Sequence, residues 1–233
     1  MSGKKGAREF TQMVPSENKK ERTFIVEFWA KVFDILRWVS LFQLLCLLVR
    51  RRPTYLFVDA WVLGHLLASL LAVVYVRFSN TNAFWYFILF YSYLRVFEII
   101  VYQVNVLLFD EHRASLRGQD YYLRSYRRIV LLLLHNYFEI IFWFAASYLV
   151  LAGQFSFEKF HGSLVGVIYS SFAVMTNIGS AGISARTLAG LYVLWAQSLV
   201  GLFMTLVSLA RFISILPVPR TLEEKEDGKG RPA

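Results

Sequence analysis

Residues 163–182 read SLVGVIYSSFAVMTNIGSAG, and the interpretation of the whole chain starts from this stretch. Its first part, 163–175, is apolar but only 13 residues long. A helix of that length reaches about 20 Å, short of the ~30 Å hydrocarbon core of a bilayer. The second part, 176–182, is rich in small residues. We predict that the two parts form a re-entrant segment, in which a half-length helix dips into the bilayer and the loop returns. Irregular backbone at membrane depth must line water or be buried in protein, so such a loop points to an aqueous path. The alternative is an apolar surface helix followed by an ordinary extracellular loop.

The composition places this stretch in a membrane protein. Of the 233 residues 57% are hydrophobic, and the mean hydropathy is +0.47. Soluble domains are about 45–50% apolar, so this excess argues against an ordinary soluble enzyme and against disorder over most of the chain. Four apolar segments are long enough to cross a bilayer. We predict transmembrane helices at 54–77, 84–109, 129–152 and 188–216.

The charge distribution predicts the topology. The net charge of +9 fits a membrane protein with basic loops on one side, with no nucleic-acid partner. With both termini in the cytoplasm, 21 of the 25 Lys and Arg residues lie on the cytoplasmic side. The positive-inside rule predicts this bias, so we expect a multi-pass protein of the cell membrane. Residues 1–23 are basic and lack an apolar core, so we expect no cleaved signal peptide.

The segment before the first predicted span is amphipathic. Glu27, Lys31 and Asp34 form one charged stripe, which favours a helix lying in the membrane interface. If 24–49 crossed the membrane instead, the arginines at 50–52 would lie outside, as in a voltage-channel-like alternative. The expected parts are a cytoplasmic polar head at 1–23, an interfacial amphipathic helix at 24–52, a peripheral two-helix transmembrane unit at 54–109, a cytoplasmic basic linker at 110–128, a pore domain at 129–217 and a disordered cytoplasmic tail at 218–233.

Small and polar residues recur on one face of the last predicted span. They are Gln197, Ser198, Gly201, Thr205 and Ser208. Polar side chains facing lipid are costly, so this face should meet water or another helix. On the stripe alone, helix packing and cavity lining are equally good explanations. Together with the re-entrant loop, we expect the last four of these residues to line a cavity.

Residues 163–217 resemble the pore half of the potassium-channel superfamily in its two-transmembrane ion-channel form. The resemblance rests on the order of pore helix, loop and inner helix, and on the closing run SLARFISILP at 208–217, which is similar to the inner-helix end of bacterial members. With 129–152 as outer helix, it covers less than half of the chain. It implies a homotetramer in the lipid bilayer, because one loop per chain cannot close a ring, and a permeant monovalent cation, potassium or sodium.

The loop departs from the family pattern, in which a Thr precedes Thr-Val-Gly-Tyr-Gly. Ser180 lacks the aromatic ring that braces the family filter, and Ala181 replaces a Gly, although a positive φ is unfavourable for Ala. We therefore expect a cation channel of weak selectivity. The rival is a non-conducting membrane scaffold or regulatory subunit that keeps the pore fold. The resemblance implies a conduction filter formed by Thr176, Asn177, Ile178, Gly179, Ser180, Ala181 and Gly182.

Two positions of the last span are candidates for gating. Phe212 lies near its cytoplasmic end and is a candidate apolar constriction. Gly201 is a candidate hinge, because Gly destabilises a helix interior, and close helix packing is the alternative.

Ionisable residues inside the spans are expected to neutralise one another. Arg95 and Glu98 are three residues apart and can pair on one helix face. His135 and Glu139, four apart, can do the same. A bolder alternative brings Asp59, on the neighbouring helix, to Arg95 and Glu98 as part of a vestigial voltage sensor. For the arginines at 124, 127 and 128 we expect contact with anionic lipid.

Nothing in the sequence predicts an enzyme. The chain has one cysteine, Cys46, and four histidines without metal-ligand spacing. It has no Gly-rich phosphate loop and no nucleophile elbow. A transporter is disfavoured because the four spans do not form a repeated half. We expect no catalytic residue, no metal site and no cofactor.

Overall fold

The computed structural model describes residues 24–38, 54–109, 126–160, 162–178 and 181–215. The predicted head, linker and tail, and the second half of the predicted interfacial helix, lie wholly or mostly outside these residues. In chain order the elements are α1 (Phe24–Trp38), α3 (Tyr55–Phe78), α4 (Ala83–Val104), the π-helical turn η1 (Asn105–Phe109), α6 (Tyr126–Val150), the 3-10 turn η2 (Ala152–Gln154), β1 (Phe155–Phe157), α7 (Leu164–Thr176), β2 (Ile183–Ala185) and α8 (Leu188–Ile215).

Four of these helices are long and apolar enough to cross a membrane. They cover Leu56–Phe78, Ala83–Val104, Val130–Val150 and Leu188–Ile213. The four predicted spans are therefore confirmed as apolar helices of membrane-spanning length, and the chain is a multi-pass membrane protein. The second span is shorter as an α-helix than predicted, because α4 passes into η1 for its last five residues.

The helices begin where the sequence offers a polar cap. Thr54, Asn82 and Ser163 precede α3, α4 and α7, and each side-chain oxygen accepts a hydrogen bond from a backbone N–H two or three residues later. Such caps satisfy donors that the first helical turn leaves without a partner.

The expectation of a purely α-helical chain is wrong in one detail. β1 and β2 form a two-stranded antiparallel sheet, in which Phe155 lies opposite Ala185 and Phe157 opposite Ile183. Each strand has three residues, and each lies in a connector between helices. Runs this short carry no readable alternation, so only the approach of the two connectors in space creates the sheet.

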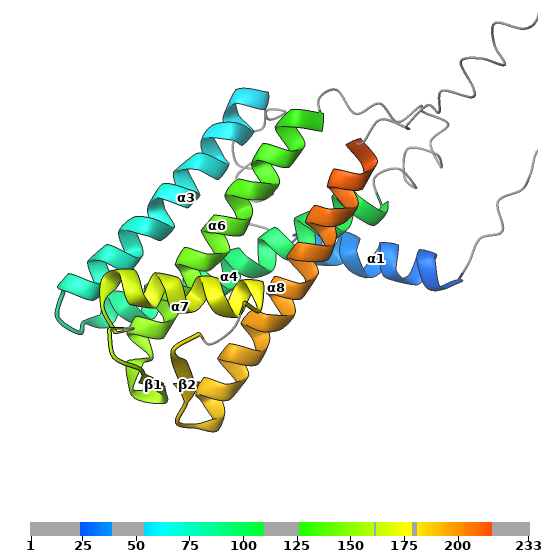
Figure 1. Ribbon diagram of the computed structural model, residues 1–233. Helices are drawn as coiled ribbons and strands as arrows, with labels where there is room; N and C mark the ends of the chain where they lie inside the picture. The colour runs from blue at the N-terminus through cyan, green and yellow to red at the C-terminus, as the bar shows by residue number, and fades with distance from the viewer. Residues whose placement is uncertain (1–23, 39–53, 110–125, 161, 179–180, 216–233) are drawn as a thin grey trace, which may run out of the picture.

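The helices α3, α6 and α8 run side by side, with the start of α3, the start of α6 and the end of α8 at one end of the molecule (Figure 1). The sheet lies at the opposite end of the molecule. Near that end, α7 crosses obliquely in front of the helix bundle (Figure 1). α6 is the most buried of the four spans and α8 the least. α6 packs in the centre of the bundle, where its residues Ile140, Phe144 and Tyr148 are fully or almost fully buried.

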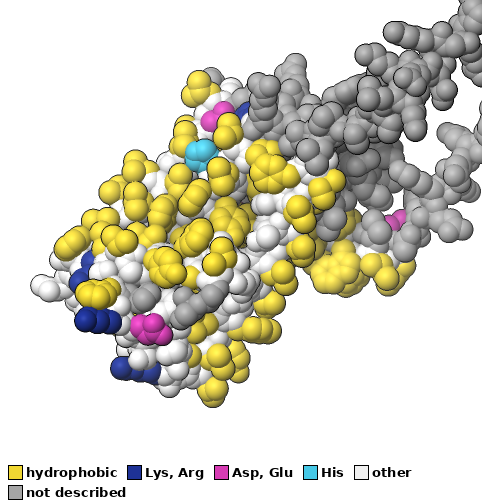
Figure 2. Space-filling model, in the orientation of Figure 1, with side chains coloured by type: hydrophobic (Ala, Val, Ile, Leu, Met, Phe, Trp, Pro, Cys, Tyr) yellow, Lys and Arg dark blue, Asp and Glu magenta, His cyan; other side chains and the backbone are white. Residues whose placement is uncertain are grey.

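The outer surface is apolar. Figure 2 shows hydrophobic side chains across the face in view, and the few charged side chains lie mostly toward its ends. Exposed apolar side chains at this density suit a surface that meets lipid rather than water. α1 adds an apolar face of its own through exposed Phe24, Phe28 and Trp29, while Phe33 packs on Phe109 at 5.6 Å between ring centres.

Candidate functional site

The short helix α7 is docked on the middle of α6. Its Ser171 is fully buried, and the Ser171 hydroxyl donates a 2.7 Å hydrogen bond to the backbone oxygen of Ile141. Ile141 is the 16th of the 25 residues of α6. A hydroxyl without a partner would be costly at this position, so the bond specifies where α7 sits along its neighbour.

The C-terminal end of α7 reaches the middle of α8. A Cβ atom added at Gly201 would lie 2.1 Å from the backbone oxygen of Met175, a distance that no side chain can tolerate. Gly201 is the 14th of the 28 residues of α8, about 20 Å along the helix. The buried Gly201 therefore allows two backbones to touch. Of the two explanations for this glycine, close packing matches the contact that the structure shows.

After α7 the chain returns to the end of the bundle that holds β1, from which it came (Figure 1). Asn177 ends the helix in a left-handed conformation, with φ 55° and ψ 33°. Gly182 also has a positive φ, 61°, and its backbone oxygen accepts a 2.9 Å hydrogen bond from the N–H of Glu158. β2 then pairs with β1 beside the start of α8 (Figure 1). The segment thus runs to mid-helix depth and back.

A single buried amide connects α6, α7 and α8. Gln197 of α8 is fully buried, and its Nε2 donates to the Ser171 hydroxyl at 2.8 Å and to the Ser171 backbone oxygen at 2.9 Å. The Tyr148 hydroxyl of α6 donates to its Oε1. The amide thus has partners at both ends, which rigidifies a polar network in an apolar interior. The helical spacing predicted Gln197 on the polar stripe, whereas its role in joining three helices depends on residues far away in the sequence.

Replacing Gln197 by Leu should cost about 1–3 kcal/mol of folding free energy, because the Tyr148 hydroxyl then loses its partner inside the protein. The double variant Gln197→Leu/Tyr148→Phe should recover part of that loss, since both polar partners are then removed together. Thermal unfolding of the purified protein followed by tryptophan fluorescence checks both values. A double variant as unstable as the sum of the two single variants contradicts the network.

The predicted filter residues lie at the end of α7 and in the loop that follows it, and they differ in exposure. Thr176 ends α7, with its hydroxyl donating to the backbone oxygen of Phe172 at 2.8 Å. Ile178 is exposed, Ala181 is half-buried, and Gly179 and Ser180 lie outside the described residues. Gly182, the last residue of the predicted filter, adopts a left-handed conformation, which glycine tolerates.

The predicted cavity-lining residues and the candidate gate Phe212 lie on α8 and differ in their exposure. Gly201 faces α7, while Thr205 and Phe212 are exposed. Ser198 and Ser208 are half-buried, and the Ser208 hydroxyl donates to the backbone oxygen of Met204 at 2.7 Å.

A buried ionic cluster joins α4 to α6. The Arg95 Nη1 binds Glu98 Oε2 at 2.7 Å, which confirms the pair predicted from spacing. The Arg95 Nε and Nη2 bind the two oxygens of Glu139 at 2.7 and 3.3 Å, and Trp143 Nε1 donates to Glu139 Oε1 at 3.1 Å. All three charged side chains are at most 5% exposed.

The predicted pair of His135 and Glu139 is wrong. His135 Nδ1 binds the backbone oxygen of Leu131 at 2.6 Å, and Glu139 turns to Arg95. Arg95 offers two parallel N–H donors, which a neutral imidazole cannot match. The spacing of residues on one helix did not reveal this partner on another helix.

The alternative that joined Asp59 to this cluster is wrong as well. Asp59 binds Arg128, with 2.6 Å between Asp59 Oδ1 and Arg128 Nη2. The contact joins α3 and α6 near their N-terminal ends, where both side chains remain partly exposed. Arg128 therefore serves a contact within the protein, in addition to any contact with lipid.

The part of the chain that the structure describes contains no group of three or more His, Cys, Asp or Glu side chains placed to hold a metal ion. The comparisons with protein-family models, with curated proteins and with solved structures gave no match for this chain.

Proposed function

We propose that this chain is one subunit of a homotetrameric cation channel of the potassium-channel-like class, with its pore built by residues 129–217. The observation that carries the proposal is the contact between the end of α7 and the middle of α8, where Gly201 lies against Met175. A short helix that ends halfway along a membrane-length helix, and a chain that returns to its starting end, support a re-entrant pore helix.

The chemistry of such a pore follows from the backbone. The C-terminal end of a helix carries partial negative charge, so α7 favours a cation near Thr176 and Asn177. Four copies of the loop bring rings of carbonyl oxygens together, and these replace the water around a permeant ion. With Asn177 and Ser180 in the loop, we propose a filter of weak selectivity between potassium and sodium.

The exposed faces of α7 and α8 favour assembly. Val165, Tyr169 and Phe172 are exposed on α7, and Trp195 and Leu199 are exposed on α8. In a closed ring, neighbouring copies cover one such face and lipid covers the rest. In the same proposal α1 lies in the interface, and the basic residues place both termini in the cytoplasm of a cell with anionic membrane lipids.

Cation flux into liposomes tests the proposal. Purified protein should pass potassium or sodium, and Gly179→Asp should reduce the flux to that of protein-free vesicles, because a side chain and a charge then occupy the filter. The matched control is Gly153→Asp, where an added Cβ meets nothing within 4 Å. It should keep the flux.

A wild-type protein that passes no cation under varied voltage, pH and lipid composition contradicts the channel. The filter sequence at 177–181 would then favour the alternative, a scaffold or regulatory subunit that keeps the pore fold. Subunit counting by cross-linking separates the two proposals further, because only the channel requires a closed ring of four.

A further inference from the structure

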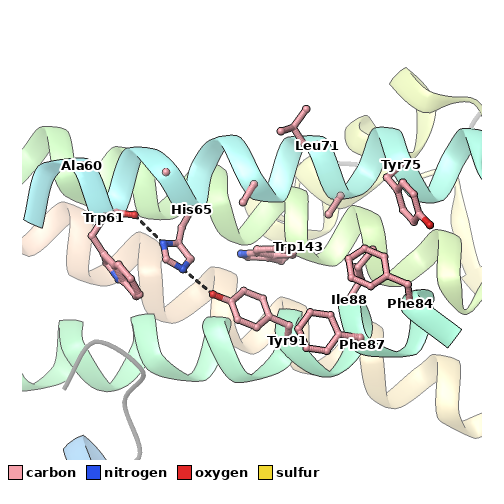
Figure 3. Close-up of a pocket in the computed structure, with 13 residues that line it drawn as sticks. Ala60, Trp61, His65, Leu71, Tyr75, Phe84, Phe87, Ile88, Tyr91 and Trp143 are labelled. Atoms are coloured by element: carbon pink, nitrogen blue, oxygen red, sulfur yellow. Dashed lines mark hydrogen bonds between the residues drawn. The ribbon is translucent and has the colours of Figure 1, made fainter. Parts of the chain in front are cut away.

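A groove of about 550 Å³ opens between α3 and α4, and none of its lining residues belongs to α7, α8 or the proposed filter. Trp61, Gly64 and His65 of α3 form one wall, Phe87 and Tyr91 of α4 form the other, and Trp143 of α6 closes the floor (Figure 3). We call it the α3–α4 groove. Its volume lies within the range of ligand pockets in proteins.

Four side chains that line the groove form hydrogen bonds within the protein, namely those of His65, Tyr91, Trp143 and Tyr75. His65 Nδ1 lies 2.8 Å from the backbone oxygen of Trp61, which can only accept, so Nδ1 carries the proton. His65 Nε2 then accepts from the Tyr91 hydroxyl at 2.7 Å (Figure 3). The floor residue Trp143 donates its N–H to Glu139, and at the far end the Tyr75 hydroxyl accepts from Asn82.

An apolar occupant fits these walls. The contact surface is dominated by aromatic rings and aliphatic groups, and water finds few partners in such a space. An apolar chain, by contrast, gains dispersion contacts with the rings and displaces none of these four side chains from their hydrogen bonds. A charged or strongly polar ligand has nothing here to neutralise it.

The surroundings of the groove identify the source of that occupant. α3 and α4 are both of membrane-spanning length, and apolar side chains that line the groove, such as Leu71 and Phe87, are also exposed on the outer surface. In a bilayer this surface meets lipid tails. The α3 wall runs from Ala60 to Tyr75, about 22 Å, which is long enough for an extended chain crossing one leaflet of a ~30 Å core.

We propose that the α3–α4 groove binds one acyl chain of a bilayer lipid, which fills the wedge between two helices that pack on α6. This site goes beyond the proposed channel and does not depend on it. The acyl chain would complete the packing of the peripheral two-helix unit, because an empty space of this size loses van der Waals contacts on every wall.

Quenching by brominated acyl chains tests the site, since Trp61 and Trp143 both line it. The reporter is the full chain with the other four tryptophans replaced by Phe, accepted after its thermal unfolding matches that of the original protein. In detergent micelles, added brominated phosphatidylcholine should quench the fluorescence saturably. Gly64→Leu, placed where a Cβ meets nothing within 4 Å, fills the groove and should raise the half-saturating lipid concentration by at least about tenfold.

Gly153→Leu is the matched control, because a Cβ there also meets nothing within 4 Å, and it should leave the titration unchanged. Quenching that rises without saturation, or that is the same in Gly64→Leu, overturns the proposal in favour of non-specific surrounding lipid. Quenching seen only after dissociation of the assembly overturns it in favour of a second copy of the chain as occupant. The quenching titration does not measure cation flux, so a negative result overturns the lipid site and leaves the proposed channel function unaffected.

Discussion

Arg95→Leu should be among the most destabilising substitutions in this protein. The variant removes the cation of the buried cluster and leaves the carboxylates of Glu98 and Glu139 without it in an apolar interior. Removing one partner of a buried pair typically costs about 3–5 kcal/mol, which corresponds to a fall in melting temperature of roughly 6–20 °C for a chain of this size. Thermal unfolding in detergent, followed by tryptophan fluorescence, measures the change.

The structure also predicts the order of related variants. Glu139→Leu should cost less than Arg95→Leu, because Arg95 keeps Glu98 as a partner. Asp59→Asn is the control at an ion pair that is 32–42% exposed, and it should cost about 1 kcal/mol or less. Equal effects of Arg95→Leu and Asp59→Asn would show that the cluster is solvated and contradict its burial. The cluster also joins the peripheral unit to α6, so Arg95→Leu should loosen α4 before the pore helices.

Gly201→Ala should be the second large effect, although it adds only one carbon. The new Cβ would lie 2.1 Å from the Met175 backbone oxygen, so α7 or α8 has to move. Overpacking typically costs about 1–3 kcal/mol, and a contact between two backbones belongs at the upper end of that range because neither can rotate away. Because this contact places the end of α7, we expect the proposed cation flux to fall along with the melting temperature.

Gly64→Ala is the matched control, a Gly→Ala change in another membrane-spanning helix. A Cβ at Gly64 meets nothing within 4 Å, so this variant should be as stable as the original or up to about 1 kcal/mol more stable. Melting temperatures of the two variants, measured side by side, separate the contact from helix propensity. If Gly201→Ala also proves neutral, the close approach of α7 to α8 is wrong.

Some features could be predicted because they depend on neighbours along the chain. The apolar length of each span is such a feature, and so is the start of α7 after Ser163, where a hydroxyl stands at the position that a helix cap needs. The pairing of Arg95 with Glu98 is a third, since residues three apart face the same side of any helix. The filter-like loop was found by resemblance, while its central residues, Gly179 and Ser180, lie outside the described structure.

Other features depend on how helices are rotated and crossed. Glu139 binds Arg95 on another helix rather than His135, which is closer in the sequence. Gln197 joins three helices through its hydrogen bonds, beyond its place on the polar stripe. Gly201 could be a hinge or a packing site until its partner, the carbonyl of Met175, was in place. The α3–α4 groove has no signature in the sequence, because it is a space between helices.

The sequence by itself determined the four membrane-length apolar helices found among the described residues and the short one between the last two, since lipid enforces length and apolarity segment by segment. Only the tertiary structure decided which polar groups meet. In an apolar interior each of them must find a partner, and that partner is set by helix rotation and approach, which no local pattern encodes.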